Sequence, residues 1–252
     1  MTILVTGARG RVARSLIQQL QAAGHEVRTT STTDPATDLN GIHKAFLYAT
    51  TPERYLSIPT LKHVVLLSAL GATNNNDAIQ RLHAEAEQTV AESDIPWTFL
   101  RPGGFATNRL RWAESIRTEG VVRSPFGDSH SALIHEADIA AVALHALTEP
   151  GHEKAIHTLT GPESLTERQQ AELIAKATGR PIVFEPQSIN DFRNSLHIGP
   201  PEVVDAVVNR LTALIDHPHE TTNTVTEITG RARTFADWAK DHAEDFTPRN
   251  EG

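Results

Sequence analysis

The 252-residue sequence contains no cysteine, which excludes disulfide bonds, thiolate metal ligands and a cysteine nucleophile. It is also poor in basic residues, because 23 lysines and arginines stand against 31 aspartates and glutamates, for a formal charge of −8. This excess of negative charge repels a long polyanion. We therefore expect no nucleic-acid partner and look for a small-molecule substrate.

Long hydrophobic runs are absent too. The longest purely apolar runs, such as residues 64–67, are far shorter than the roughly 20 residues that cross a bilayer. The first residues, MTILVTG, contain neither the basic region nor the long apolar stretch of a signal peptide. We expect a cytoplasmic protein with no membrane partner, and the sequence leaves its oligomeric state open.

The first hundred residues alternate short apolar runs with segments of helical periodicity. Strands are predicted at residues 2–6, 25–30, 44–48, 63–68 and 97–100, and helices at 11–23 and 77–93. This alternation indicates an α/β fold with a doubly wound parallel sheet. After about residue 105 the pattern is irregular, and helices are predicted at 139–147, 166–178, 201–215 and 235–246.

These patterns predict two parts. Residues 1–150 form the domain with the parallel sheet, to which some later segments can return, and residues 151–252 form a smaller, mainly helical substrate or cap region. Two connections between strands of the first part are short, residues 32–43 and 49–62. They barely reach the dozen or so residues that a crossover between parallel strands needs. We expect helical turns or loops there and not full helices.

A glycine-containing loop joins the first predicted strand to the first helix, with the sequence TGARGRVA at residues 6–13. Gly7 and Gly10 permit a tight turn and a close backbone approach, while the first helical N–H groups face a diphosphate. Arg9, Arg11 and Val12 complete the predicted cofactor contacts. The alternative is an ordinary strand-to-helix turn, which the position directly after an N-terminal strand disfavours.

The end of the second strand bears on the choice of dinucleotide. An NAD site usually has an acidic residue there to bind the ribose hydroxyls, but this chain has Thr30, Ser31 and Thr32. Arg9 lies directly before Gly10 in the phosphate loop and Arg28 lies close to the end of the second strand, and a guanidinium near the ribose favours a 2′-phosphate. The sequence therefore predicts NADP(H), with NAD(H) possible and with Ser31 among the contacts. Arg9 can equally be a solvated loop charge.

Six stretches together resemble the NmrA-like family of atypical short-chain dehydrogenases/reductases: TGARGRVA at 6–13, HVVLLSALGA at 63–72, IPWTFLRPGGFATN at 95–108, HEADIAAVA at 135–143, TLTGPESLT at 158–166 and TGRARTFADWAKDHAEDF at 229–246. The resemblance spans nearly the whole chain. It implies a Rossmann-type NAD(P)-binding domain with a smaller C-terminal domain. Members of the family include quinone oxidoreductases, isoflavone-type reductases and regulators that bind the dinucleotide.

The usual Tyr-x-x-x-Lys pair of short-chain dehydrogenases is missing, because prolines stand four residues after both Tyr48 and Tyr55. His83 is the alternative proton donor, since imidazole titrates near neutral pH. Isoflavone-type reductases carry an active-site lysine as far before an aromatic residue as His83 lies before Trp97 in this sequence. Glu87, one helical turn later, is predicted to orient it. The alternative places His83 on a solvated helix flank.

Residues at the ends of the predicted strands are further candidates, because ligands bind outside the carboxyl ends of parallel strands. Ser68 is predicted as a catalytic residue and a cofactor contact, and Thr50, Pro102 and Gly103 as cofactor contacts. The predicted substrate wall consists of Phe105, Asn108, Trp112 and Phe126. Plain strand-end hydrogen bonding and core packing remain the alternatives for these residues.

Histidine is abundant, with 13 residues, but none lies in a HExxH arrangement, and we expect no metal site. The acidic segment His135–Asp138 is predicted to start a helix near Ile139, with Asp138 as its N-cap. The sequence as a whole predicts an NADPH-dependent oxidoreductase that reduces a small apolar or aromatic acceptor, such as a quinone, an enone or an imine. A non-redox biosynthetic enzyme and a dinucleotide-binding, redox-sensing regulator remain alternatives.

Overall fold

The computed structural model describes residues 1–30, 38–73 and 77–248, so the predicted contact Ser31 lies outside the described residues. Contacts divide the chain into two compact units, each built from three segments. Unit 1 contains residues 1–103, 136–159 and 223–231, and unit 2 contains residues 104–135, 160–222 and the segment from 232 onward.

Unit 1 is built on a six-stranded sheet in the order β2-β1-β3-β4-β5-β8, with every neighbouring pair parallel. The strands are β1 (Thr2–Val5), β2 (Glu26–Thr29), β3 (Ile42–Tyr48), β4 (His63–Leu67), β5 (Trp97–Pro102) and β8 (Ala155–Leu159). All residues of β1 and β4 are buried, as expected for strands covered on both faces. The predicted Rossmann-type parallel sheet is confirmed.

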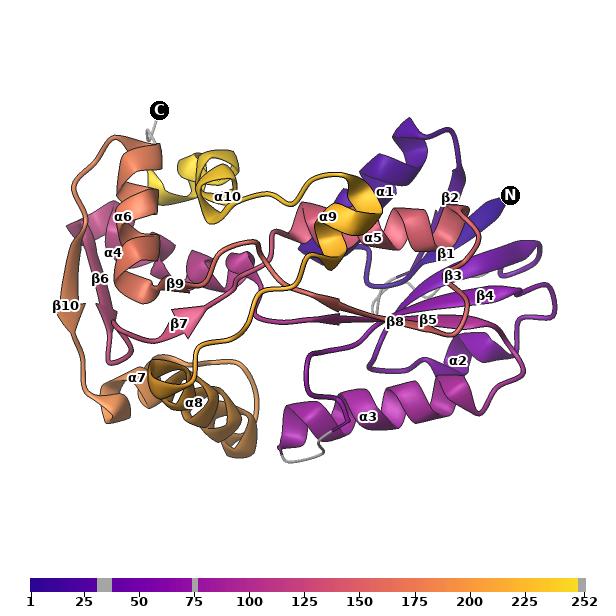
Figure 1. Ribbon diagram of the computed structural model, residues 1–252, viewed down its shortest axis with the longest axis horizontal. Helices are drawn as coiled ribbons and strands as arrows, with labels where there is room; N and C mark the ends of the chain where they lie inside the picture. The colour runs from indigo at the N-terminus through magenta and orange to yellow at the C-terminus, as the bar shows by residue number, and fades with distance from the viewer. Residues whose placement is uncertain (31–37, 74–76, 249–252) are drawn as a thin grey trace. The chain divides into compact units, whose positions relative to one another are not determined.

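Helices cover both faces of this sheet (Figure 1). One face carries α1 (Arg11–Ala22), α5 (Glu136–Thr148) and α9 (Thr224–Thr229), of which α5 packs on both others. The other face carries α2 (Glu53–Leu56) and α3 (Ala78–Ala91). The apolar stripe of α1 faces the core because Val12, Leu16 and Leu20 recur at helical spacing and are all buried.

The sheet ends at β2, whereas the doubly wound order 3-2-1-4-5-6 places another strand outside the second one. Within the described residues no strand occupies that place. The short connections account for this difference. Residues 49–62 contain only the four-residue helix α2, as predicted, and the first half of residues 32–43 lies outside the described part of the chain.

Unit 2 is mainly helical, which confirms the predicted character of the smaller part. Its helices are the 3-10 helices η1 (Ala106–Trp112) and η2 (Ala243–Phe246) and the α-helices α4 (Ala113–Glu119), α6 (Glu167–Thr178), α7 (Ile189–Ser195), α8 (Pro201–Asp216) and α10 (Phe235–Asp241). One of its cores gathers around the fully buried Trp238 and Phe246. Phe126, Phe192 and three apolar residues of α8 form a second core.

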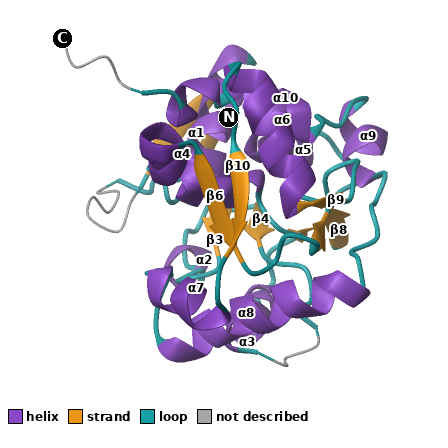
Figure 2. Ribbon diagram, turned by 90° about the vertical axis from the view of Figure 1, so that its left-hand side faces the viewer, coloured by secondary structure: helices purple, strands orange, loops and turns teal. Residues whose placement is uncertain are grey.

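Unit 2 also contains two small sheets that the sequence did not predict. A parallel pair joins β6 (Val121–Ser124) to β10 (Val183–Pro186) (Figure 2). An antiparallel pair joins β7 (His130–Ser131) to β9 (Leu165–Thr166). Strands of two to four residues are too short for an alternating pattern to be recognised. Residues 104–135 pack in unit 2, and residues 223–231 pack in unit 1, to which some later segments were expected to return.

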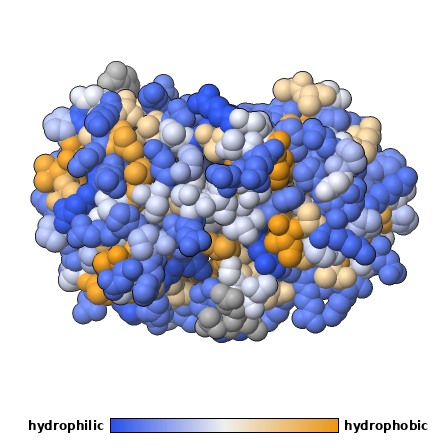
Figure 3. All heavy atoms as spheres, in the orientation of Figure 1, coloured by the Kyte–Doolittle hydropathy of each residue, from blue (hydrophilic) through white to orange (hydrophobic). Residues whose placement is uncertain are grey.

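On the surface, large apolar side chains are scattered. The face in Figure 3 shows separate apolar patches among polar atoms. Among the described helices, none combines the length and apolar character needed to cross a bilayer.

One histidine of the unit 1 sheet is held neutral by its surroundings. His63 on β4 is 3% exposed, and burial, followed by the nearby charge of Lys44, lowers its pKa to about 4. Thr98 Oγ1 donates to the His152 carbonyl at 2.6 Å, so it accepts from His63 Nε2 at 2.9 Å. His63 Nδ1 is buried and lacks a hydrogen-bond partner within the described part of the chain, so protonation adds an unpaired buried donor.

We expect this histidine to make the protein less stable in acid. Its pKa in the folded protein lies below the unfolded value of about 6.5, so the unfolded chain binds the proton first as the pH falls. The contribution of His63 to stability is complete above about pH 6.5 and is lost as the pH falls toward about 4, which lowers the free energy of unfolding by about 3 kcal/mol. Urea unfolding at several pH values, compared with His63→Gln, measures this loss. The exposed His217→Gln variant is the control, and an equal decline in His63→Gln would contradict the assignment.

Candidate functional site

The predicted phosphate loop forms a tight turn between β1 and α1. Gly7 adopts a φ of +64°, in the left-handed region that glycine favours, and the Gly10 N–H donates to the Gly7 carbonyl at 2.7 Å. The Ala8 N–H donates to the carbonyl of Thr30, which fixes the loop against the end of β2. The helix α1 then begins at Arg11 with Gly10 as its N-cap residue.

The N-terminus of α1 is prepared for an anion. Gly10 offers no side-chain cap and the first turn contains no acidic residue, so no side chain of this turn balances the positive end of the helix. Arg9, Arg11 and Arg14 are exposed around it, although cations are unfavourable at a helix N-terminus. A bound diphosphate would satisfy the free N–H groups and the arginines together.

Tyr48, at the end of β3, packs directly on the loop. A Cβ atom added to Gly7 would lie 2.7 Å from the Tyr48 ring, and one added to Gly10 would lie 2.8 Å from its hydroxyl oxygen. Burial raises the pKa of Tyr48, while a hydrogen bond with the Ala13 backbone acts in the opposite direction. Both glycines are therefore needed for contact with this ring, a role that the sequence did not reveal.

The structure distinguishes the two arginines predicted near the ribose. Arg28 on β2 lies 3.4 Å from the Asp38 carboxylate and 3.8 Å from that of Glu26, and it also donates to the carbonyl of Asn40. Its Nη1 donors are therefore already used, and two carboxylates compensate its charge. Arg9 is exposed and has no ion-pair partner in the described part of the chain, which makes it the better candidate for a 2′-phosphate.

Ser68 lies at the end of β4 in a buried polar cluster. Its hydroxyl donates to Glu87 Oε1 at 2.5 Å, and the same carboxylate accepts from Arg101 Nε at 2.8 Å and Nη2 at 2.5 Å. The hydrogen bond to Glu87 raises the pKa of Arg101. This arrangement links the ends of β4 and β5 to α3.

The cluster changes the roles expected for two predicted residues. Glu87 was predicted to orient His83. Its two carboxylate oxygens instead accept hydrogen bonds from Ser68 and Arg101. Ser68 directs its proton to Glu87 and is therefore better suited to accept a hydrogen bond than to donate one. His83 is half-buried on α3 and remains a predicted proton donor.

The other strand-end candidates differ in exposure. Thr50 follows β3 and is exposed. Pro102 is buried, its carbonyl accepts from the Leu70 N–H, and the Gly103 N–H donates to the carbonyl of Leu159. These bonds fix the backbone that follows β5, and the cofactor contacts of Thr50, Pro102 and Gly103 stay predictions.

Two residues of the predicted substrate wall line a cavity of about 550 Å³ in unit 2. They are Asn108 and Trp112, both on η1. Phe126 is buried behind the cavity and packs edge to face on Phe192, with 5.1 Å between the ring centroids. Phe105 is half-buried and its backbone pairs with Ile134, so a substrate contact of its side chain stays a prediction.

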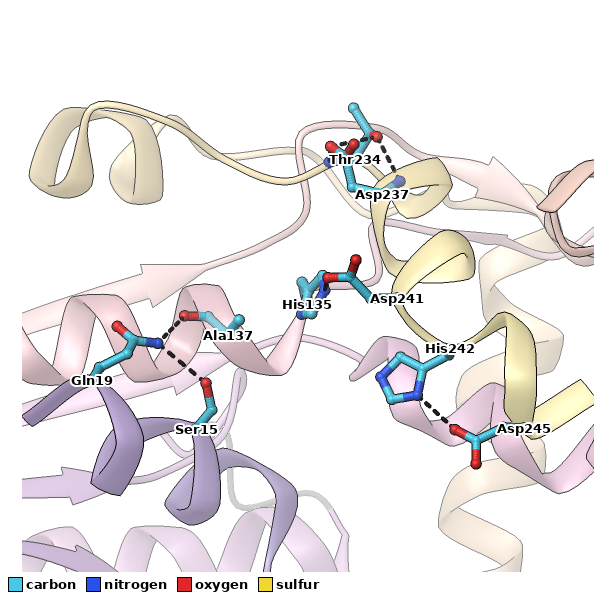
Figure 4. Close-up of polar contacts among 9 residues, drawn as sticks. All are labelled: Ser15, Gln19, His135, Ala137, Thr234, Asp237, Asp241, His242 and Asp245. Carbon is cyan, nitrogen blue, oxygen red and sulfur yellow. Dashed lines mark hydrogen bonds and ion pairs between the residues drawn. The ribbon is translucent and has the colours of Figure 1, made fainter. Parts of the chain in front are cut away.

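The segment around residue 135 corrects a predicted helix start. The helix α5 begins at Glu136, which places Asp138 in the first turn and not at the N-cap. The Ala137 carbonyl accepts from Gln19, which ties α5 to α1, and His135 lies 3.3 Å from the Asp241 carboxylate (Figure 4). The helix starts earlier because acidic residues are favourable throughout a first turn and not only at the cap.

Comparison with known proteins supports the nucleotide site. Residues 59–150 match a family model described as NAD(P)H-binding. The chain is 36% identical over 280 residues to the (4-alkanoyl-5-oxo-2,5-dihydrofuran-3-yl)methyl phosphate reductase of Streptomyces griseus, with 98% of this chain and 99% of that protein covered. It is 38% identical over 191 residues to the NAD(P)H azoreductase of Xenophilus azovorans, with 74% and 67% covered.

A solved structure shares the fold. The NADPH-dependent quinone oxidoreductase of Escherichia coli superimposes with a TM-score of 0.73 at 24% sequence identity, covering 95% of this chain and 98% of that one.

Proposed function

Since the chain belongs to the NmrA-like family of atypical short-chain dehydrogenases/reductases, we propose that it uses NADPH to reduce a small apolar or aromatic acceptor, such as a quinone, an enone or an imine. It is an NAD(P)H-dependent oxidoreductase, as its named relatives from Streptomyces griseus and Xenophilus azovorans are. The proposal concerns the preference for NADPH, the acceptor class and the residues involved.

The observation that carries the proposal is the N-terminus of α1, where the N-cap residue Gly10 has no side chain and exposed arginines replace the acidic residues that would otherwise be favourable. Backbone N–H groups of Arg11 and Val12 would hold the diphosphate, and Arg9 would bind the 2′-phosphate of NADPH. The buried side chain of Val12 anchors the helix, so only its backbone reaches the ligand.

Reduction of such an acceptor consumes one hydride and one proton, and the bound dinucleotide supplies the hydride and is oxidised. The residues at the ends of β4 and β5 would position it, since the bonds of Ser68, Pro102 and Gly103 hold this backbone rigid. The proton would come from His83 or from water. Quinones and enones need only weak acid assistance, which agrees with the absence of a tyrosine–lysine pair.

Absorbance at about 340 nm, the band of reduced nicotinamide, tests this function directly. We expect purified protein to oxidise NADPH in the presence of a panel of quinones, enones and imines, with kcat/KM for NADPH higher than for NADH. Calorimetry with NADPH alone gives the affinity independently of turnover.

The alternatives correspond to other outcomes of the same experiment. Tight NADPH binding without turnover across all acceptor classes would favour a redox-sensing regulator. Absence of nucleotide binding would favour a non-redox enzyme on the same fold. Either result contradicts the proposed reductase.

A further inference from the structure

The cavity of unit 2 has a small annex. The main cavity of about 550 Å³ adjoins a second one of about 100 Å³, because Asn108, Arg111 and Val207 line both. Helices η1 and α8 supply these three residues. The annex has the volume of a small polar group, and the main cavity has room for the body of a substrate.

A buried cluster beside the annex contains more positive than negative charge. Arg109 Nη1 and Arg111 Nη2 each lie 2.9 Å from the same oxygen, Oε1 of Glu167. Arg109 is 2% exposed and Glu167 is fully buried, while Arg111 is partly exposed. Two guanidinium groups thus share one carboxylate, and a net positive charge is left in a poorly solvated place.

The donors of these arginines are not all used. Arg109 Nη2 is buried and has no hydrogen-bond partner among the described residues, although Arg109 Nε donates to Gln170 at 2.5 Å. Burial lowers the pKa of Arg109 to about 10, and the charge of Arg111 contributes in the same direction. A buried unpaired donor beside an uncompensated charge is unfavourable unless an anion completes the site.

The rest of the annex is also suited to an anion. Arg210, Ser131 and His219 line it, and no carboxylate lines either cavity within the described residues. Burial, followed by the nearby charge of Arg210, lowers the pKa of His219. Three arginines therefore line the annex, while Glu167, the carboxylate that pairs with Arg109 and Arg111, does not line it.

The main cavity offers an aromatic surface. The Arg111 guanidinium lies 5.5 Å from the Trp112 ring centroid and 5.3 Å from that of Phe192, and both rings line the cavity. Stacking on two rings holds this guanidinium at the junction with the annex. The two cavities together pair an apolar surface with one cationic end.

From this arrangement we infer that unit 2 binds an acceptor with an anionic group, a phosphate monoester or a carboxylate, whose oxygens are held by Arg109, Arg111 and Arg210 while its apolar body lies against Trp112 and Phe192. The inference rests on the proposed reductase function and specifies its substrate class. It makes the arginines specificity residues, because they recognise a group away from the reacting atoms.

The test compares a naphthoquinone that carries a carboxylate with its methyl ester. We expect kcat/KM for the carboxylate to be about 10- to 100-fold higher, as hydrogen bonds to charged groups provide discrimination of that size. Arg111→Gln should remove most of this preference, measured as the ratio of the two kcat/KM values. The variant should fold, because Arg109 and Glu167 then form a one-to-one pair.

Lys176→Gln is the matched control, since it removes one positive charge from the exposed face of α6 without lining either cavity. It should leave the ratio of the two acceptors unchanged. If Arg111→Gln loses its thermal transition, Arg210→Gln, on another wall of the annex, replaces it. An ester reduced as well as the carboxylate by wild-type protein would overturn the inference while the reductase function stands.

Calorimetry with phenyl phosphate separates the two proposals further. If neither quinone is reduced, the proposed function fails, and phenyl phosphate binding then decides the anion site alone. Binding that Arg111→Gln weakens about 10-fold supports the site, and the absence of binding to wild-type protein overturns it.

Discussion

Replacing Gly10 by alanine is expected to weaken NADPH binding about 10- to 100-fold, because the new Cβ atom would lie 2.8 Å from the Tyr48 hydroxyl oxygen and 3.2 Å from the Gly7 carbonyl oxygen. The free protein can relieve this overlap by displacing the loop. NADPH requires the undisplaced loop, so the cost appears in the binding constant. Calorimetric titration of the variant with NADPH measures it.

A second substitution identifies the cause of this loss. In Gly10→Ala/Tyr48→Phe the hydroxyl is gone and the nearest ring carbon lies at an ordinary 3.5 Å, so much of the affinity should return. Gly24→Ala is the control: its φ of +80° makes the alanine cost stability, but its Cβ meets nothing within 4 Å and lies at the far end of α1, so NADPH affinity should not change. If Tyr48→Phe restores nothing, Gly10 is needed for the ligand's own approach and not for contact with Tyr48.

Glu87→Gln should lower the free energy of unfolding by about 3–5 kcal/mol, because it leaves the charge of Arg101 uncompensated in a nearly buried place. The side chains of Arg101 and Glu87 are 13% and 9% exposed, and Ser68 loses its carboxylate acceptor in the same variant. Urea denaturation with a single probe in unit 1 gives the change in stability.

A double variant separates the loss of the Glu87–Arg101 attraction from the cost of leaving Arg101 buried without a counter-charge. Glu87→Leu/Arg101→Leu removes both charges, and it should recover more than half of the stability lost in Glu87→Gln. The exposed pair Glu114–Arg117 provides the comparison, since Glu114 is 79% exposed and Glu114→Gln should cost no more than about 0.5 kcal/mol. A similar loss at both sites would show that burial of the pair is unimportant.

The sequence predicted the parts of the fold that depend on local patterns. The strand at Thr2–Val5, the glycine turn and the helix from Arg11 are adjacent, so apolar runs, glycine and helical spacing were enough to place them. The short strands of unit 2 were not predicted, because their pairing partners lie far away in the chain. The pairing of β10 with β6 joins segments about 60 residues apart, and no local signal reports it.

In the candidate site, too, contacts between residues distant in the sequence were not predicted. The loop at Gly7 was recognisable, but Tyr48, which decides why glycine is needed there, comes from a strand about 40 residues later. Glu87 was assigned to His83 because helical spacing makes them neighbours, whereas its partners Ser68 and Arg101 lie 19 and 14 residues away. Charge balance in unit 2 depends equally on a distant partner, since Glu167 and Arg111 are 56 residues apart.

The interleaving of the two units has a consequence for how such a protein evolves. Six segments alternate between them, so the polypeptide passes from one to the other five times. No single truncation releases either unit whole, and no single fusion adds one. The nucleotide-binding half and the half with the arginine-lined cavity therefore evolve as one indivisible chain, and new acceptor preferences must arise by substitution in place and not by exchange of a module.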